Sequence, residues 1–465
     1  MAQYDLIVIG AGPAGYVAAI KAAQLGKKVA LAEKDEVGGT CLNRGCVPTK
    51  ALAHAAGLLE EMRACERFGL HAENVSYDIE AMHTRKNVVV AQLRAGIEQL
   101  LKANGVTLLR GAAVVEEASA ARVNGMLYTA ERILLAVGAQ PALPPIPGIG
   151  LPGVVTSDGL LAKSDAVWRR LVIIGGGVIG VEFASIYRAM GSEVTIVEAM
   201  ERILPTAERE IAQNLAMLFK KRGIQIHAAT RVESIARGAD ALVCRVEAKG
   251  GALELLADGV LVCVGRRAAT EGLLADGVDL GLERGQIPVD AQFETRVKGI
   301  YAVGDAVKGG VQLAHAASAQ AANAVAAMFG ASPPVNLTAV PACIYTNPEI
   351  AFVGLTAEEA KAAGLPVKAG KFLMAANGKS RIVQAERGFI KIVSHAETGV
   401  VLGAQLMCPR ATDMIGELAT AVANKLTVGQ LASVIRPHPT FSEGVSEALE
   451  DVLGAAVHVL PKRKL

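Results

Sequence analysis

The 465-residue chain has few aromatic residues, a single tryptophan and almost no excess of charge. Its 47 basic residues nearly balance 45 acidic ones, and without a long basic run we expect no nucleic-acid partner. No secretory leader follows Met1. The most apolar window, residues 171–187, contains four glycines and Glu182 and is too short to span a bilayer. These absences predict a cytoplasmic protein that does not enter the membrane.

Glycine and hydrophobic residues are abundant instead, with 49 glycines and 52% hydrophobic residues. A chain of this length exceeds a single core, and this composition is typical of a large α/β protein with many strand-to-helix turns. We therefore expect three or four domains. Five of the seven cysteines are scattered through apolar surroundings and are expected to be buried, inert thiols. They are Cys65, Cys244, Cys263, Cys343 and Cys408.

The other two cysteines, Cys41 and Cys46, are separated by four residues. In a helix they would lie about 7.5 Å apart along the axis, and in a strand about 17 Å apart. Only a tight loop, which Gly45 permits, brings them to bonding distance. If Cys46 begins a helix that includes Lys50, both the helix N-terminus and the lysine favour a thiolate there. This arrangement predicts a redox-active disulfide, although the spacing alone leaves open two unpaired thiols or half of a metal site.

A nucleotide-binding pattern precedes the cysteines. A strand over residues 4–9 leads into three glycines, a helix and a second strand over residues 28–33. The first glycine makes the turn, the second lets a pyrophosphate approach, and the third lets helix and strand pack closely. These glycines are Gly10, Gly12 and Gly15. Glu33 closes the second strand, where an acid binds ribose hydroxyls.

The same pattern returns after a strand over residues 171–174. Its glycines are Gly175, Gly177 and Gly180. A helix to about residue 190 and a strand over residues 194–198 follow, ending in Glu198. A carboxylate there binds a free 2′-hydroxyl and repels a 2′-phosphate, which predicts NAD rather than NADP. One of the two units could instead be a structural repeat without a ligand. Because nicotinamide and a dithiol both pass electron pairs, two such sites beside a disulfide suggest a flavin between them.

Two later segments add a candidate acid and a candidate base. Residues 299–305 resemble a buried strand that ends in Asp305, which alone has no special meaning. His438 lies between two prolines and so cannot sit inside a helix. We expect Ser442 to cap the next helix and Glu443 to lie in its first turn, where it could fix the tautomer of the histidine. On the sequence alone, a loop histidine is more often structural than catalytic.

Together these motifs resemble the pyridine-nucleotide disulfide oxidoreductases over essentially the whole chain, and within them the branch that reoxidises protein-bound dihydrolipoyl groups. The markers are residues 12–16, 38–43, 48–50, 345–349, 409–417 and 438–440. The resemblance implies two Rossmann-like domains, which bind FAD and NAD, and a C-terminal α+β dimerisation domain. The implied domains are an FAD-binding domain at 1–143, an NAD-binding domain at 144–267, a central domain completing the FAD site at 268–335 and an interface domain at 336–465.

The resemblance also implies the thiol chemistry. Cys41 would exchange with the substrate, and Cys46 would form a charge-transfer thiolate beside the flavin. His438 and Glu443 would form the base dyad, supplied by the opposite subunit of a homodimer. The base would take a proton from a dihydrolipoyl protein, and the resulting thiolate would attack Cys41. Electrons would then pass through FAD to NAD⁺. The implied partners are the lipoyl domains of acyltransferase subunits or the lipoyl protein of glycine cleavage.

The cofactor contacts follow from the same resemblance. Lys50 would lie near the flavin ring and pair with Glu182, and Asp305 would bond the ribityl chain. The further cofactor contacts that it implies are Ala113, Ala314, Val232 and Gly265. No metal site is implied.

Some positions depart from the family pattern. Residues 136–138, 265–270 and 316–320 differ from the usual motifs, and Arg436-Pro437 leaves the geometry of the base loop open. Three alternatives remain. Mercuric reductases usually end in a vicinal cysteine pair, whereas residues 460–465 contain no cysteine. Glutathione-type reductases need basic residues for NADPH. A non-catalytic flavoprotein would not need the two cysteines and the histidine.

Overall fold

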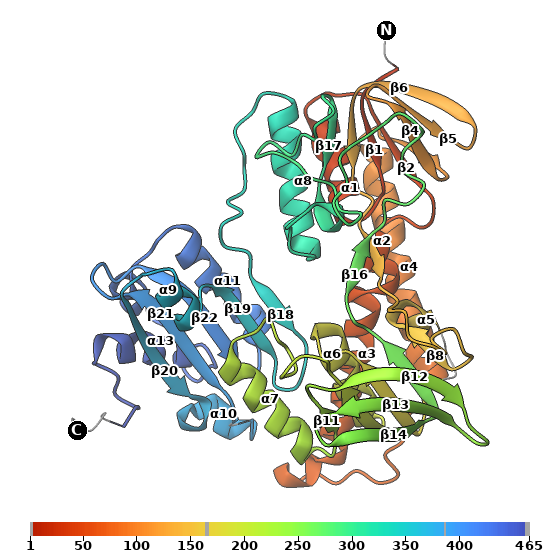
Figure 1. Cartoon of the computed structure of the whole chain (residues 1–465). Coiled ribbons are helices and arrows are strands. Elements are labelled where there is room, and N and C mark those ends of the chain that lie inside the picture. The colour runs from red at the N-terminus through yellow and green to blue at the C-terminus, as the bar shows by residue number, and fades with distance from the viewer. Residues whose placement is uncertain (1–2, 163–166, 386, 461–465) are drawn as a thin grey trace. The chain divides into compact units, whose positions relative to one another are not determined.

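The computed structural model describes residues 3–162, 167–385 and 387–460 of the chain (Figure 1). The chain forms two compact units. The first contains Met1–Gly175, Val232–Val246 and Ala252–Leu337, and the second contains Gly176–Arg231, Glu247–Gly251 and Thr338–Leu465. The predictions about a leader and about the C-terminal residues depend largely on positions 1–2 and 461–465, which lie outside the described residues.

The first unit is built on a seven-stranded sheet in the order β3-β2-β1-β6-β5-β4, with β17 paired to β6 (Figure 1). Strands β1, β2, β3, β6 and β17 run parallel, and β4 and β5 form an antiparallel extension. The strands are β1 (Tyr4–Ile9), β2 (Val29–Glu33), β3 (Thr107–Arg110), β4 (Ala113–Glu117), β5 (Ala120–Val123), β6 (Met126–Leu135) and β17 (Ile300–Ala302). The inner strands are nearly all apolar and buried, as expected for a sheet covered on both faces.

Alanine-rich helices cover this sheet closely. Helices α1 and α8 pack together through small buried side chains such as Ala18 and Ala321. The hydroxyl of Ser318 on α8 also donates to the carbonyl of Pro13, the first residue of α1, at 3.2 Å. The helical elements of this unit are α1 (Pro13–Gln24), α2 (Gly39–Arg44), α3 (Cys46–Arg63), η1 (Cys65–Phe68), α4 (Ile79–Ala103), α5 (Ser157–Ala162), η2 (Gly304–Ala306) and α8 (Ala314–Met328).

Three smaller sheets complete the strands of the first unit. In one, β15 pairs in parallel with both β8 and β9. The others are the antiparallel pair β7 and β16 and the set β12-β13-β14. The strands are β7 (Ala139–Pro141), β8 (Val154–Thr156), β9 (Arg170–Ile174), β12 (Arg231–Arg237), β13 (Leu242–Ala248), β14 (Gly251–Ala257), β15 (Gly259–Val262) and β16 (Arg266–Ala268).

The second unit contains a five-stranded antiparallel sheet in the order β18-β19-β22-β21-β20. Helix α11 packs on β19 and β22, and α13 packs on β20 and β21. The strands are β18 (Ala342–Ile344), β19 (Ile350–Gly354), β20 (Val367–Leu373), β21 (Phe389–His395) and β22 (Val401–Met407). The helical elements around them are α9 (Ala357–Ala362), η3 (Met374–Ala376), α10 (Gly378–Ile382), α11 (Ala411–Ala423), α12 (Val428–Ala432) and α13 (Glu443–Leu453).

The same unit includes α6 (Val178–Ala189), β10 (Glu193–Val197), α7 (Arg209–Lys221) and β11 (Gln225–His227). An ion-pair network joins the start of α7 to the antiparallel sheet. The Nζ atom of Lys391 lies 2.6 Å from Glu208 and 2.5 Å from Glu210, and Lys371 lies 2.8 Å from Glu210. The side chains of Lys391 and Glu208 are only 14% and 10% exposed, so this contact is largely removed from water.

The predicted fold class is confirmed. The strand, glycine loop, helix and strand pattern occurs twice along the chain, and an antiparallel sheet with helices follows. The apolar window at 171–187 is a buried strand and helix, as predicted, and none of the described helices is long and apolar enough to cross a membrane. The prediction for the scattered cysteines is wrong for Cys65 and Cys343, which are only half-buried. Cys65 lies in the short helix η1, where its thiol donates to the exposed carbonyl of Leu70 at 3.4 Å.

Candidate active site

Cys41 and Cys46 lie on either side of a one-residue break between two helices. Cys41 is the third residue of α2, Cys46 is the first residue of α3, and Gly45 ends one helix and precedes the other. A Cβ atom on Gly45 would lie 2.9 Å from the carbonyl oxygen of Thr40, so a side chain there would force the two helices apart. The expected loop is therefore reduced to one glycine, and the predicted start of a helix at Cys46 is confirmed.

No disulfide joins the two cysteines in this structure, and Cys41 is half-buried while Cys46 is exposed. A hydrogen bond to Cys46, burial and the charge of Cys46 raise the pKa of Cys41, against a smaller opposing effect of Lys50. Two sulfur atoms in such contact carry one negative charge more readily than two. Because Cys46 begins α3, the helix N-terminus favours that charge on Cys46. The two side chains are thus in hydrogen-bonding contact, and the proton is held firmly on Cys41.

Asn43, which the sequence analysis missed, fixes the helix that carries Cys41. Its amide group Nδ2 donates to the carbonyl oxygens of Val37 and Gly39 at 3.0 Å each, and to that of Glu36 at 3.3 Å. The turn before α2 and α2 itself are therefore held by one side chain. The sequence showed an amide residue between the two cysteines, which could have indicated this role. Its acceptors, however, are backbone carbonyl groups that only the folded turn brings together.

The first glycine loop has the geometry of a phosphate site. Gly10 has a φ of 98°, and a Cβ atom there would lie 2.5 Å from the carbonyl oxygen of Ala136. A Cβ atom on Gly15 would lie 1.7 Å from the carbonyl oxygen of Gly10, so strand and helix touch at these two residues. At Gly12, by contrast, the nearest atom is the Cα of Gly39, 3.9 Å away. The open space thus lies before the uncapped N-terminus of α1, where a pyrophosphate is favourable.

The second glycine loop repeats this geometry. Gly175 has a φ of 110°, and a Cβ atom there would lie 2.5 Å from the carbonyl oxygen of Cys263. A Cβ atom on Gly177 would meet no atom within 4 Å. Helix α6 begins at the next residue without a side-chain cap, and Gly180 is buried within it. Both loops therefore offer backbone N–H groups to an anion.

The two acids that end the second strands are held in the same way. Each carboxylate accepts a hydrogen bond from the residue after the first glycine and another from the residue two positions beyond the acid. For Glu33 these donors are Ala11 at 2.6 Å and Asp35 at 2.8 Å, and for Glu198 they are Gly176 at 2.6 Å and Met200 at 2.7 Å. Both acids are more than nine-tenths buried. Burial raises the pKa of Glu33, although the bond from Ala11 opposes it.

Asp305 fits the role expected beside a flavin. It lies in η2, directly after β17, and no hydrogen bond to its carboxylate is found among the described residues. Burial raises its pKa, while the charge of Arg266 lowers it. A half-buried carboxylate without a donor suits a ligand hydroxyl, as on the ribityl chain of FAD. Each glycine loop, taken by itself with its bound acid, is compatible with one dinucleotide, which fits a protein that holds FAD and NAD.

The other residues predicted to contact a cofactor lie at separate places along the chain. Ala113 is the first residue of β4, and Val232 is the second residue of β12. Ala314 begins α8 without a side-chain cap, and Gly265 is exposed between β15 and β16 with a φ of 117°. Their contacts with a cofactor stay predictions.

Glu182 and Lys50 belong to different units of the chain. Glu182 is buried on α6, where its carboxylate accepts a hydrogen bond from the backbone N–H of Tyr345 at 2.9 Å. Lys50 lies on α3, four residues after Cys46. The predicted pairing of Lys50 with Glu182 therefore stays a prediction, while the bond to Tyr345 shows a further task of this buried acid.

His438 and Glu443 form the expected dyad within the second unit. The Nδ1 atom of His438 lies 2.6 Å from Oε1 of Glu443, and Oε2 accepts a hydrogen bond from the N–H of Thr440 at 2.8 Å. The ring is 76% exposed. Ser442 is the N-cap residue of α13 as predicted, but its side chain makes no capping hydrogen bond, and its hydroxyl pairs with that of Thr440 at 2.9 Å.

Arg436, the unusual residue of the base loop, anchors the loop. Its side chain is 5% exposed. It donates to Ser446 on α13 at 2.9 Å and forms an ion pair with Glu417 on α11. The Arg436-Pro437 departure is therefore compatible with a complete dyad.

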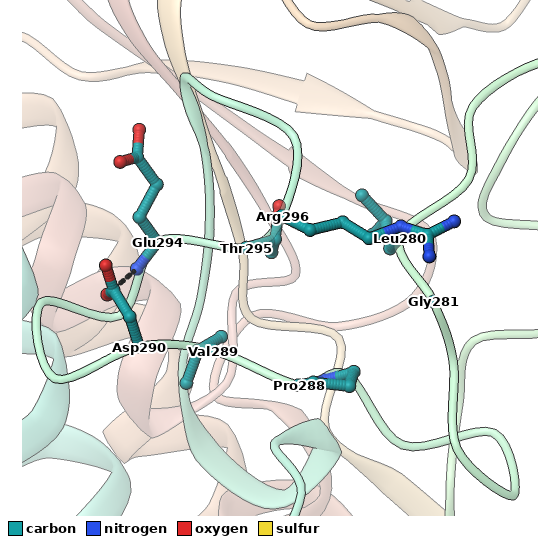
Figure 2. A pocket seen from close by; sticks show the side chains of 8 residues that line it. All are labelled: Leu280, Gly281, Pro288, Val289, Asp290, Glu294, Thr295 and Arg296. Atoms are coloured by element: carbon teal, nitrogen blue, oxygen red, sulfur yellow. Dashed lines mark hydrogen bonds between the residues drawn. The ribbon is translucent and has the colours of Figure 1, made fainter.

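A surface hollow of about 470 Å³ lies in the first unit and contains none of the predicted site residues (Figure 2). Asp290 in its wall accepts hydrogen bonds from the N–H groups of Gln292 and Glu294, and the guanidinium of Arg296 bonds to Asp279. Its polar groups are thus largely occupied with one another. Within the described residues, no group of three or more histidine, cysteine or acidic side chains could hold a metal ion.

Comparison with known proteins identifies the family of this chain over nearly its full length. Residues 4–321 match the model of the pyridine nucleotide-disulphide oxidoreductases, and residues 340–449 match the dimerisation domain of that family. Dihydrolipoyl dehydrogenases of Bacillus subtilis and Thermus scotoductus are 38% and 41% identical, and the alignments cover 98% and 99% of this chain and 99% and 100% of theirs. The solved structure of the HOCl-induced flavoprotein disulfide reductase RclA from Escherichia coli is 31% identical, with a TM-score of 0.86 over 96% of this chain and 99% of that one. The chain therefore belongs to the pyridine nucleotide-disulphide oxidoreductase family.

Proposed function

We propose that the chain oxidises protein-bound dihydrolipoyl groups and passes their electrons to NAD⁺. The observation that carries this proposal is the Cys41–Cys46 pair, two thiols in mutual contact across Gly45. The glycine loop that precedes the pair and the second loop that follows it supply the nucleotide sites. Similarity to dihydrolipoyl dehydrogenases over the whole chain supports the choice of substrate and of electron acceptor.

The protein residues carry out the thiol chemistry. The bond between His438 Nδ1 and Glu443 leaves Nε2 of the ring to accept a proton. When Nε2 removes the proton from a dihydrolipoyl thiol, the thiolate attacks Sγ of Cys41 and breaks the Cys41–Cys46 disulfide. Cys46 leaves as a thiolate. The second lipoyl thiol then attacks the first lipoyl sulfur, and its proton passes to Cys41, which is released from the mixed disulfide as a thiol. Oxidised lipoyl leaves, with Cys46 as a thiolate and the first proton on His438.

The cofactor sites would hold FAD at the first glycine loop and NAD⁺ at the second. Gly12 and Glu33 would contact the pyrophosphate and ribose of FAD, and Asp305 would accept from a ribityl hydroxyl. Gly177 and Glu198 would do the same for NAD⁺, with the carboxylate selecting against a 2′-phosphate. When bound, a flavin supplies transfer of an electron pair between a dithiol and a nicotinamide.

We propose that the active enzyme is a homodimer and that the partner subunit's His438 completes each site. The match of residues 340–449 to a dimerisation domain supports the dimer. The exposed ring of His438 supports an arrangement in which the base serves a neighbouring subunit. The proposed division into domains at 1–143, 144–267, 268–335 and 336–465 assigns the base to the last of them. The proposed partners are lipoyl domains of cytoplasmic acyltransferase complexes or the lipoyl protein of glycine cleavage.

The test is an assay of the purified, FAD-loaded protein with dihydrolipoamide and NAD⁺. We expect NADH to form, and we expect much slower reaction with NADP⁺. Cys41→Ser should abolish NADH formation while FAD stays bound, because the interchange sulfur is lost. Cys65→Ser is the matched control, since Cys65 is a half-buried thiol outside the pair. Absence of NADH in the wild-type reaction, or full activity of Cys41→Ser, would refute the proposal.

A further inference from the structure

Helix α13 carries a second imidazole–carboxylate pair that the proposed cycle leaves unused. The Nδ1 atom of His458 lies 2.6 Å from Oε1 of Glu447, and the backbone N–H of His458 donates to the other carboxylate oxygen at 3.0 Å. The base dyad has the same design, because Glu443 binds the ring of His438 at 2.6 Å and the N–H of Thr440 at 2.8 Å.

The two pairs share one face of α13. Glu443 and Glu447 are four residues apart, which places their side chains one above the other along the helix. In each pair the acid is more buried than the histidine, and the side chains of Glu443 and Glu447 are 27% and 13% exposed. The rings of His438 and His458 are 76% and 67% exposed. Two exposed imidazoles therefore stand beside neighbouring acids of one helix.

Other charged groups near this face are already paired or lie farther along it. Arg436 binds Ser446 and Glu417, and Asp451 accepts a hydrogen bond from the N–H of Lys371 at 2.9 Å. Glu450 acts on His458 through its charge. These groups keep their charges in the variants described below, so the His458–Glu447 pair can be changed alone.

The electrostatics link the two pairs directly. The hydrogen bond and the charge of Glu447 raise the pKa of His458, and the charge of Glu443 adds to this effect. Burial alone would raise the pKa of Glu443, but bonds from His438 and Thr440 and the charges of His438 and His458 lower it. Each pair therefore responds to the charge of the other.

We propose that His458 and Glu447 act as positioning residues for the base His438 through Glu443. The positive charge of His458 favours the carboxylate form of Glu443, which holds the ring. The same charge also acts near the ring of His438, which Glu443 holds by a hydrogen bond. Glu447 balances this effect. The inference rests on the proposed function, because the base matters only if the chain oxidises dithiols.

The proposal predicts opposite effects for the two members of the pair. His458→Gln leaves Glu447 as an unbalanced negative charge, so the acidic limb of the rate profile should move to higher pH. Glu447→Gln leaves His458 as an unbalanced positive charge in mild acid, so that limb should move to lower pH. Because the His458 side chain is 67% exposed and its charge is screened by water, we expect shifts of about half a pH unit that shrink at high salt.

The experiment measures kcat/KM for dihydrolipoamide against pH with the FAD-loaded dimer and saturating NAD⁺. His458→Lys keeps a positive charge beside Glu447 and should restore the wild-type profile. His71→Gln removes an exposed histidine of the other unit and should leave the profile unchanged. FAD content, dimer size and NADH oxidation by an artificial acceptor, which bypasses the base, test whether each variant is folded.

Superimposable profiles for wild type, His458→Gln and Glu447→Gln would overturn the inference. So would a uniform loss of activity at all pH values that His458→Lys does not restore, because a purely structural role predicts that result. If the wild-type enzyme forms no NADH from dihydrolipoamide, the proposed function itself fails. The two failures are thus distinguished by the wild-type reaction alone.

Discussion

Alanine in place of Gly12 or Gly177 should separate binding of the two nucleotides. The backbones of both glycines, with φ of −69° and −73°, are accessible to alanine. A methyl group at Gly12 would meet no atom closer than 3.9 Å, and one at Gly177 no atom within 4 Å. The empty protein should therefore fold unchanged or gain about 0.5 kcal/mol from a less flexible unfolded chain.

Each methyl group would fill the space before a helix N-terminus. Loss of one charge-assisted hydrogen bond between backbone and phosphate costs about 1.5–3 kcal/mol, which corresponds to binding weakened roughly 10- to 100-fold. Gly12→Ala should therefore lose FAD during purification while it keeps its circular dichroism spectrum. Gly177→Ala should stay yellow and show a raised KM for NAD⁺ with little change in the dithiol reaction.

Gly15→Ala is the matched control for these two variants. Its Cβ atom would lie 1.7 Å from the carbonyl oxygen of Gly10, a backbone atom that cannot move without opening the sheet. This variant should lose stability as well as FAD. Wild-type affinity for FAD in Gly12→Ala, or loss of FAD in Gly177→Ala, would refute the assignment of one nucleotide to each loop.

Three further outcomes concern the second unit. His438→Gln should lower kcat/KM for dihydrolipoamide by about 10²- to 10⁴-fold and leave FAD bound. Stopped-flow reduction measures the first effect and flavin absorbance the second. If the variant oxidises dihydrolipoamide as fast as wild type, another residue is the base. Lys391→Met should lower stability by about 3 kcal/mol, because Glu208 and Glu210 lose a largely buried cation, and an unchanged melting temperature would contradict this. Arg436→Met should weaken the base loop and slow dithiol oxidation without loss of FAD, and normal turnover would show that the arginine is dispensable.

The Lys391 network also predicts a dependence of stability on pH. Burial alone would raise the pKa of Glu210, but hydrogen bonds from Lys371 and Lys391 lower it. The carboxylate of Glu210 therefore contributes to stability above the ordinary carboxylate pKa. That contribution is lost as pH falls through the lowered pKa. Burial alone would lower the pKa of Lys391, but hydrogen bonds to Glu208 and Glu210 raise it. The contribution of the Lys391 cation to stability is therefore lost as pH rises through the raised pKa. The difference in melting temperature between wild type and Lys391→Met should therefore be largest near neutral pH and shrink in strong acid and strong base.

The parts predicted best from the sequence are those that depend on local spacing. The first strand, Tyr4–Ile9, has the predicted bounds, and the glycine pattern after it requires one particular turn. Cys46 begins a helix as predicted, since Gly45 and the following residues set that boundary locally. The position of Glu443 in the first turn of α13 followed from Ser442 as the predicted N-cap residue.

The parts that the sequence did not predict depend on contacts between distant backbone atoms. The acceptors of Asn43 are carbonyl groups whose positions are set by the turn before α2. His458 and Glu447 are eleven residues apart, and only the reversal of the chain after α13 brings them together. Ser442 stands at the N-cap position, but its hydroxyl found a nearer partner in Thr440.

The buried acids Glu33 and Glu198 have a consequence for attempts to redesign coenzyme choice. Each acid closes its own glycine loop, because one carboxylate oxygen holds an N–H group of the loop and the other holds the N–H group two residues beyond the acid. If a neutral or basic residue replaced Glu198, the N–H groups of Gly176 and Met200 would lose their acceptor and the loop would loosen. A variant that accepts a phosphorylated ribose thus needs a substitute oxygen for the loop as well as a cation for the phosphate.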